Sequence, residues 1–210
     1  MNKTFPKAEE IIEISNDIIN KWHGEEANIS SFDAMKILNY NNQDNILHHI
    51  EILSLINTIQ WHEEDKARDN DSLDSVIVET KRKIDKSNDK RVNKIEEIDE
   101  ILFEKIYFNE EAPVNTESLG SVIDRLTILA LKQNHMSYEA NRNDSTKEQR
   151  NKCQEKLFMI NKQMDDLIKA YNYLIMEIEM GKRRFVIYKQ FKMYNDLDLN
   201  PVLYKKKVKN

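Results

Sequence analysis

Apolar positions recur at helical spacing along most of the chain. In residues 6–22, one face is formed by four residues spaced four, three and four apart: Ile11, Ser15, Ile18 and Trp22. This spacing follows the period of an amphipathic α-helix. Residues 43–68 are apolar nearly all round between Ile46 and Ile59. A helix that is apolar on every side is buried, so this range predicts the central helix, reached through a connection at 24–45.

Two further helices follow from the same periodicity. Asp71 or Ser72 can cap the N-terminus of a helix that continues to about Phe108. A break at Pro113 and Asn115 precedes a helix with five apolar positions on its face: Leu119, Val122, Leu126, Leu129 and Met136. The range 43–108 therefore predicts a long antiparallel hairpin, because only a short turn near residue 71 separates its two helices.

The last long helix has the most regular pattern. Residues 145–148 have the sequence Ser-Thr-Lys-Glu, a capping box that starts a helix, and Gly181 suits the position just after its end. Between them, eight residues alternate four and three apart: Cys153, Leu157, Ile160, Met164, Leu167, Tyr171, Leu174 and Ile178. We expect this coiled-coil-like seam to pack within the molecule or across a dimer.

The C-terminal segment 182–210 differs from the rest. Its aromatic residues first recur every three positions: Phe185, Tyr188, Phe191 and Tyr194. We expect a short helix followed by an ordered extended strap that buries Phe191 and Tyr194 against the bundle. The chain then divides into one helical domain, 1–195, and a C-terminal strap with a basic tail, 196–210.

Composition agrees with an all-α fold. The 210 residues include only three Gly and three Pro, the residues on which the turns of sheet proteins depend. Charged residues make up 33% and apolar residues 40% of the chain, which suits a bundle with solvated faces. We predict an antiparallel bundle of about five helices, with the long central hairpin and an ordered C-terminal strap.

Charge is distributed unevenly. Residues 182–210 contain nine Lys/Arg and two Asp, a net charge of +7, so the remaining 181 residues carry −12 of the total of −5. The basic segment can pair with the acidic body or with an anionic partner, and we favour the body. Nucleic acid is a poor candidate partner, because an acidic body repels phosphate.

Several features predict a cytoplasmic protein. Cys153 is the one cysteine, which excludes an internal disulfide and suits a reducing compartment. A signal peptide is not expected, because four acids interrupt the first apolar stretch: Glu9, Glu10, Glu13 and Asp17. Apolar runs stay well short of the ~20 residues of a membrane span, so we expect no membrane partner.

The core-facing stripe of the central helix becomes polar at residues 57–69. Folding the hairpin about residue 71 places Asn57 beside Asp85, and Trp61 beside Lys81 and Arg82. The next helix interrupts its own apolar stripe at matching depth. The candidate ligand-binding residues are Asn57, Trp61, Glu64, Asp65, Arg68, Arg82, Asp85, Asn88 and Arg91.

Three interpretations of this polar cluster stay open, one of which is a surface that contacts a partner. Arginines can bind the phosphate or carboxylate of a ligand while Trp61 contacts a ring. Alternatively, the charges form a salt-bridge lock that fixes the register of the helices, since buried charges must be paired. Catalytic residues cannot be assigned, because a Gly-rich phosphate loop, a Ser-His-Asp order and a Cys-His pair are all missing from the sequence. Whether the protein is an enzyme stays open.

A second constellation lies on the same hairpin. His48 and Glu51 have H-x-x-E spacing, and Glu96 and Asp99 have E-x-x-D spacing. Each spacing puts two ligands on one helical face, so a divalent metal is a possible cofactor. We expect His23, at the end of the first helix, to cap that helix rather than to belong to a site.

Four motifs carry a resemblance to a known family: N-x-x-x-W-x-x-E-D-x-x-R at 57–68, K-R-x-I-D-x-x-N-x-x-R at 81–91, I-E-E-I-D at 95–99, and the tail Y-K-Q-F-K-M-Y-N-D…L-N-P-V-L-Y. They resemble the bacterial family called domain of unknown function 4254, and the likeness extends from Lys-Trp-His at 21–23 into the tail. One departure is Leu197, where the family pattern has Pro.

The resemblance implies a general setting rather than an activity. The family has no established activity, and its members are similar to proteins encoded near glycosyltransferases of envelope polysaccharide assembly. We therefore expect an accessory protein or enzyme of cell-envelope glycan assembly that binds a phosphorylated sugar or nucleotide. The alternative is a non-enzymatic helical scaffold or dimerisation module. In either case we expect a homo-oligomer.

Overall fold

The computed structural model describes residues 5–25, 36–40, 45–106 and 109–207. This part of the chain contains five long helices, a 3₁₀ turn and a short final helix, and the predicted all-α class is confirmed. The elements are α1 (Ala8–Glu25), α2 (Ile46–Lys66), α3 (Asp74–Phe103), α4 (Leu119–Asn141), α5 (Lys147–Glu179), η2 (Met193–Asn195) and α6 (Pro201–Lys207). None of these helices is long and apolar enough to cross a membrane.

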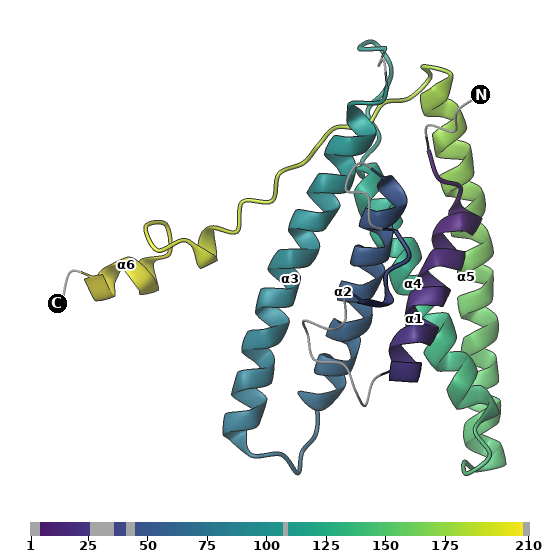
Figure 1. Ribbon diagram of the computed structural model, residues 1–210, viewed down its shortest axis with the longest axis vertical. Helices are drawn as coiled ribbons and strands as arrows, with labels where there is room; N and C mark the ends of the chain where they lie inside the picture. Colours follow the sequence, from purple (N-terminus) through teal and green to yellow (C-terminus); the bar gives the residue numbers. More distant parts are fainter. Residues whose placement is uncertain (1–4, 26–35, 41–44, 107–108, 208–210) are drawn as a thin grey trace.

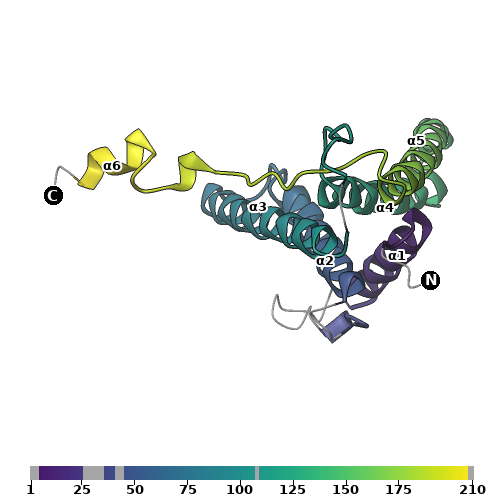
Figure 2. The same ribbon diagram turned by 90° about the horizontal axis from the view of Figure 1, so that it is seen from above.

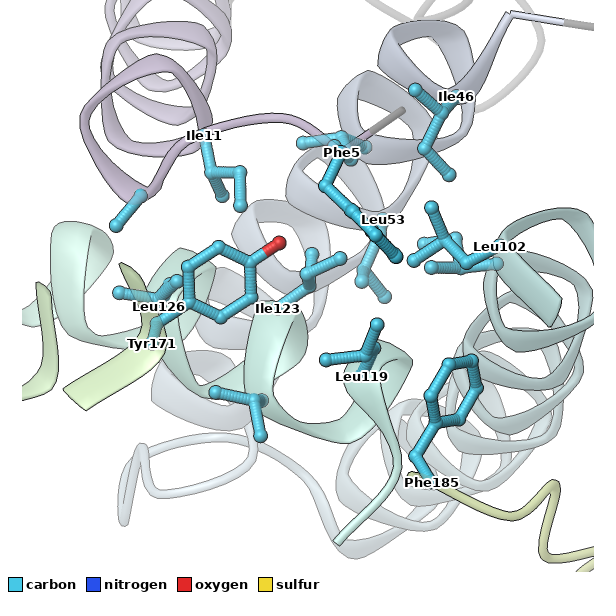
Figure 3. Close-up of a cluster of buried hydrophobic side chains, with 14 of the residues drawn as sticks. Phe5, Ile11, Ile46, Leu53, Leu102, Leu119, Ile123, Leu126, Tyr171 and Phe185 are labelled. Carbon is cyan, nitrogen blue, oxygen red and sulfur yellow. The ribbon is translucent and has the colours of Figure 1, made fainter. Parts of the chain in front are cut away.

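The bundle consists of two antiparallel helical hairpins with α1 packed against both. Figure 1 shows the α2–α3 hairpin on one side and the α4–α5 hairpin on the other. Helix α1 lies against α2 and α4, and it also touches α5. The core therefore forms where three layers meet. Figure 3 shows side chains from all five long helices converging there, with Leu53, Ile123 and Tyr171 among them.

Local hydrogen bonds explain where the helices start. Thr146 caps α5 by accepting the N–H of Gln149, one residue after the predicted capping serine. Helix α3 begins at Asp74 without a side-chain cap, and neither Asp71 nor Ser72 caps it as predicted. Both are held in the preceding turn, because the carboxylate of Asp69 accepts the Asp71 N–H and the Ser72 hydroxyl.

Helix α5 is anchored along a narrow seam. Its fully buried residues are Met164, Tyr171 and Ile178, seven positions apart, and the Tyr171 hydroxyl donates to the Pro6 carbonyl at 3.2 Å. The other positions of the predicted stripe, such as Ile160 and Leu167, are half-buried. Three of the eight positions of the predicted stripe are therefore fully buried, and all three lie in the second half of the helix.

Gly181 ends α5 and redirects the chain. It has a φ of 66°, a left-handed conformation that suits glycine, and the Lys182 N–H returns to the Glu177 carbonyl. The chain then pairs briefly with the loop before α4, where Arg184 N–H donates to the Pro113 carbonyl at 3.0 Å. This pairing brings Phe185 into the core, where it is completely buried.

Residues 188–207, here called the arm, leave the bundle. Figures 1 and 2 both show this segment running out past α3 to α6. The predicted order of helix then strap is wrong, because extended backbone comes first and the short helix follows. The predicted burial of Phe191 and Tyr194 is also wrong, since they are 84% and 65% exposed. Ion pairs hold the arm against α3 instead: Lys189 pairs with Glu96, and Lys192 pairs with Asp89.

Candidate functional site

The two helices of the central hairpin meet in a different register from the predicted one. Gln60 donates to Asn88 at 2.9 Å, and Lys81 lies 3.2 Å from Glu64. Asn57 is consequently level with Arg91, six residues beyond the predicted neighbour Asp85. The connection between the two helices spans residues 67–73, whereas the prediction assumed a tight turn near residue 71.

A buried network joins the base of the polar stripe to α4. The carboxylate of Asp124 accepts two hydrogen bonds from Arg91, Nε at 2.9 Å and Nη2 at 2.6 Å. Asn57 donates to the same carboxylate at 3.0 Å and to the Thr127 hydroxyl at 2.9 Å. Thr127 in turn donates to the Asp124 carbonyl. One carboxylate therefore organises polar groups from α2, α3 and α4.

This network satisfies the charges that it buries. Asp124 is only 4% exposed, and an unpaired carboxylate at that depth would cost several kcal/mol. The bidentate pair with Arg91 offsets this cost. The hydrogen bond to Asp124 raises the pKa of Arg91 despite the opposing effect of burial, so the guanidinium stays charged. The base of the stripe has the properties of a register lock.

Above the network, the stripe opens into a cleft of about 300 Å³. Its walls come from α2, α3 and α4, and the lining residues are Asn57, Gln60, Trp61, Glu64, Asp65, Arg68, Arg91, Ile128 and Leu131. Six of the nine residues predicted for ligand binding are thus brought together. The other three lie outside the lining: Arg82 and Asp85 are exposed on α3, and Asn88 is held by Gln60.

The cleft has mixed charge. Glu64 accepts hydrogen bonds from Arg68 and Lys81, and these contacts, that from Arg68 first, lower the pKa of its carboxyl. Asp65 is exposed at the rim. Arg91 lies at the base and Arg68 near the end of α2, so the two guanidinium groups approach the cleft from different depths. Ile128 and Leu131 supply an apolar wall.

Three histidines lie on the side of Trp61 that faces away from the cleft. The rings of Trp61 and His135 are stacked, with centroids 4.9 Å apart and planes 14° apart. His135 lies beside His62 and His23, and the ligand atoms of the three are all within 4.8 Å of one another. Among the residues that the structure describes, this is the one group of three or more His, Cys, Asp or Glu spaced for a metal ion.

The residues predicted to bind a metal do not converge in this way. Glu51 is buried and accepts the backbone N–H groups of Asn39 and Tyr40, both at 2.9 Å. Glu96 pairs with Lys189 of the arm, and Asp99 accepts the Gly120 N–H at 2.6 Å. His48 packs edge-on against His49. Each of these four side chains therefore has a different contact, and they do not form one site.

Sequence reasoning missed the contribution of α4. Four residues spaced three, four and four apart form a face beside its apolar stripe: Asp124, Thr127, Leu131 and His135. Polar residues at core-type spacings mark the polar stripes of α2 and α3, and the same criterion identifies Asp124 within residues 119–141. The convergence of His23, His62 and His135 has no local signal, because the three lie far apart in sequence on α1, α2 and α4.

Comparisons with known proteins identify the family. A search of curated proteins finds no match, and neither does a search of solved structures. A family model described as a protein of unknown function, DUF4254, matches residues 47–187. That range covers α2 to α5, with the buried network and the whole lining of the cleft, and most of the chain. The protein therefore belongs to the DUF4254 family.

Proposed function

We propose that the protein binds a phosphorylated sugar or nucleotide in the cleft, and acts as an accessory protein or enzyme of cell-envelope glycan assembly. The observation that carries the proposal is the cleft itself. It has two arginines, an aromatic ring and an apolar wall around about 300 Å³. Small-molecule sites combine apolar and aromatic side chains with convergent polar groups, and this cleft has both kinds. The glycan setting rests on the family resemblance.

The arginines have donors to spare for a phosphate. Asp124 accepts one hydrogen bond each from Nε and Nη2 of Arg91, which leaves N–H groups of Nη1 and Nη2 to donate to a ligand. Arg68 contacts Glu64 through Nη1 alone, and its side chain is 67% exposed. A guanidinium carries five N–H donors in a planar fork, which suits phosphate oxygens. Arg68 at the rim is therefore the expected first contact of an anionic group.

The acids restrict the kind of ligand. Glu64 and Asp65 would repel a bare anion, but a carboxylate accepts hydrogen bonds from the hydroxyls of a sugar or ribose. A molecule with a phosphate at one end and hydroxyls at the other satisfies both kinds of group. This combination favours a sugar phosphate, a nucleotide or a nucleotide-sugar over inorganic phosphate.

A matched pair of variants tests the proposal. The thermal stability of the wild-type chain is measured with a nucleoside diphosphate, a nucleoside diphosphate sugar and a hexose phosphate. At least one should raise the melting temperature, because ligand that binds only the folded state stabilises it. Arg68→Ala should abolish the shift. Arg82→Ala, which removes an exposed arginine outside the cleft, should keep it. A panel without any shift, or a shift that Arg68→Ala leaves intact, contradicts the proposal.

A second candidate function, a dimerisation module, is favoured by the outer face of α5. Five large apolar side chains are exposed there: Phe158, Met159, Tyr173, Met176 and Met180. At 100° per residue they fall within an arc of about 100°, and they span about 33 Å of helix. Exposed apolar patches of this kind mark interaction surfaces.

The oligomeric state distinguishes this second candidate. The mass of the full chain in solution is compared with that of a Phe158→Ser/Tyr173→Ser double variant. A dimer that dissociates in the variant supports the module. A wild-type monomer at all accessible concentrations rules it out, without bearing on the cleft.

A further inference from the structure

Three helices each contribute one histidine to a single point. His23 lies in the last turn of α1, His62 in the last two turns of α2, and His135 in the C-terminal half of α4. These helices pack against one another in the bundle (Figure 1). The ring centroids are 5.1–5.3 Å apart in all three pairs. Each histidine is therefore a direct neighbour of both others.

The spacing of the nitrogens suits a metal ion. The Nε2 atoms of His23 and His62 are 3.2 Å apart, and the ligand atoms of the three residues all lie within 4.8 Å of one another. Nitrogens bound to zinc at about 2.0–2.1 Å in a tetrahedral arrangement are about 3.3 Å apart. The His23–His62 pair has this separation, and the distances from the ligand atom of His135 to the other two do not exceed 4.8 Å.

We propose that His23, His62 and His135 form a binding site for a divalent transition-metal ion of the zinc type. Imidazole nitrogens favour zinc, nickel and copper, whereas magnesium and calcium favour oxygen ligands. His23 is exposed, so an ion can enter from solvent, while Trp61 stacks on His135 and holds that ring in place. The ring of Trp22, 6.3 Å from that of His62, covers another side.

The donor set also bears on what the ion would do. Three histidines leave the fourth position of a tetrahedral ion open, which is the arrangement of catalytic zinc sites rather than of closed structural ones. The site lies directly behind Trp61, a wall of the cleft. The proposal does not depend on the cleft binding a phosphorylated ligand, and it stands or falls on metal binding alone.

The test uses the full chain without a histidine tag, stripped of metal with a chelator. Zn²⁺ is titrated by calorimetry, and Co²⁺ is added as a visible probe because the d–d bands of tetrahedral Co²⁺ absorb visible light strongly. We expect one equivalent of Zn²⁺ per chain, a tetrahedral Co²⁺ spectrum that Zn²⁺ abolishes, and no uptake of Mg²⁺.

Single variants assign the ligands. His23→Ala removes an exposed side chain and should leave the fold unchanged by circular dichroism. It should weaken Zn²⁺ binding by more than the roughly 10–100-fold that the loss of an outer partner costs, and His62→Ala should do the same. His48→Ala is the matched control, because His48 lies on α2 four turns before His62, about 21 Å away. Absence of Zn²⁺ binding in the full chain, or binding that His23→Ala and His62→Ala leave unchanged, overturns the proposal.

Discussion

At the scale of single residues, Asp124 joins polar side chains of α2 and α3 to α4. It is the shared acceptor of Arg91 and Asn57, and it lies on α4, for which the sequence pattern predicts no site residue. The stripe on α2 was enough to predict Asn57, Trp61 and Arg68 as neighbours, because residues on one helical face stay together whatever the helix packs against. The partners of that face could not be predicted, since they depend on tertiary packing.

The network predicts a large cost for removing Asp124. Asp124→Ala leaves Arg91 and Asn57 without their acceptor, and breaking a buried pair in this way costs roughly 3–5 kcal/mol. Urea denaturation measures the loss. The control is Glu117→Ala, which breaks the exposed pair of Glu117 with Arg125, the residue next to Asp124 in sequence, and should cost less than about 1 kcal/mol. Equal losses in the two variants would mean that the network is not a lock.

Asp99 predicts a specific dependence on pH. Burial raises the pKa of its carboxyl to about 6, although the Gly120 N–H lowers it. The folded state therefore binds this proton more tightly than the unfolded state, whose carboxyl has its ordinary pKa near 4. The stability contributed by this group is full below pH ~4 and is lost as the pH rises through about 6.

The variant Asp99→Asn isolates this contribution, because it keeps an acceptor but does not titrate. When the pH falls from 7 to 4, the unfolding free energy of the wild type should increase relative to that of the variant by on the order of 2–3 kcal/mol. Urea melts of both proteins across this range give the difference. A difference that stays constant with pH would mean that Asp99 titrates normally in the fold.

At the scale of elements, the close crossing of α3 and α4 depends on Gly120. A Cβ at this position would lie 2.4 Å from the Ile95 carbonyl oxygen, closer than any real contact. The hydrophobic periodicity of the sequence predicts both helices, but it carries no information on how closely their backbones approach each other. The same limit applies to the α2–α3 hairpin, whose register the periodicity does not determine.

This crossing predicts opposite effects of one substitution at two glycines. Gly120→Ala must push α3 and α4 apart and should cost roughly 1–3 kcal/mol, the usual cost of overpacking. Gly24→Ala in the last turn of α1 meets nothing within 4 Å and should stabilise the protein by up to about 1 kcal/mol. Thermal melts of the two variants test both signs. A neutral Gly120→Ala would show that the helices can separate freely.

At the scale of the whole molecule, charge and apolar burial act on different parts of the C-terminal segment. Phe185 belongs to the core, whereas the arm beyond it is held through Lys189 and Lys192 on the acidic face of α3. The charge asymmetry of the sequence correctly favoured contact between tail and body. The burial of Phe191 could not be judged from its spacing, because a three-residue period fits neither a helix nor a strand.

Two truncations separate these contributions. Ending the chain after Gly181 removes the buried Phe185 ring and should lower the melting temperature by roughly 5–15 °C. Ending it after Ile187 keeps that ring and removes only the exposed arm, whose surface ion pairs contribute little, so the melt should shift by only a few degrees. A large loss in the longer truncation would show that the arm packs on the body, or on a second copy, more closely than charge pairs explain.

The central claim, that the cleft takes a phosphorylated ligand beside Trp61, is tested most directly by the fluorescence of that residue. The chain has two tryptophans, so a Trp22→Phe variant reports on Trp61 alone. Titration with a nucleoside diphosphate sugar or a hexose phosphate should change its emission in a saturable way, and adding Arg68→Ala should remove the change. Unchanged emission for every compound that stabilises the protein would place binding elsewhere and contradict the account.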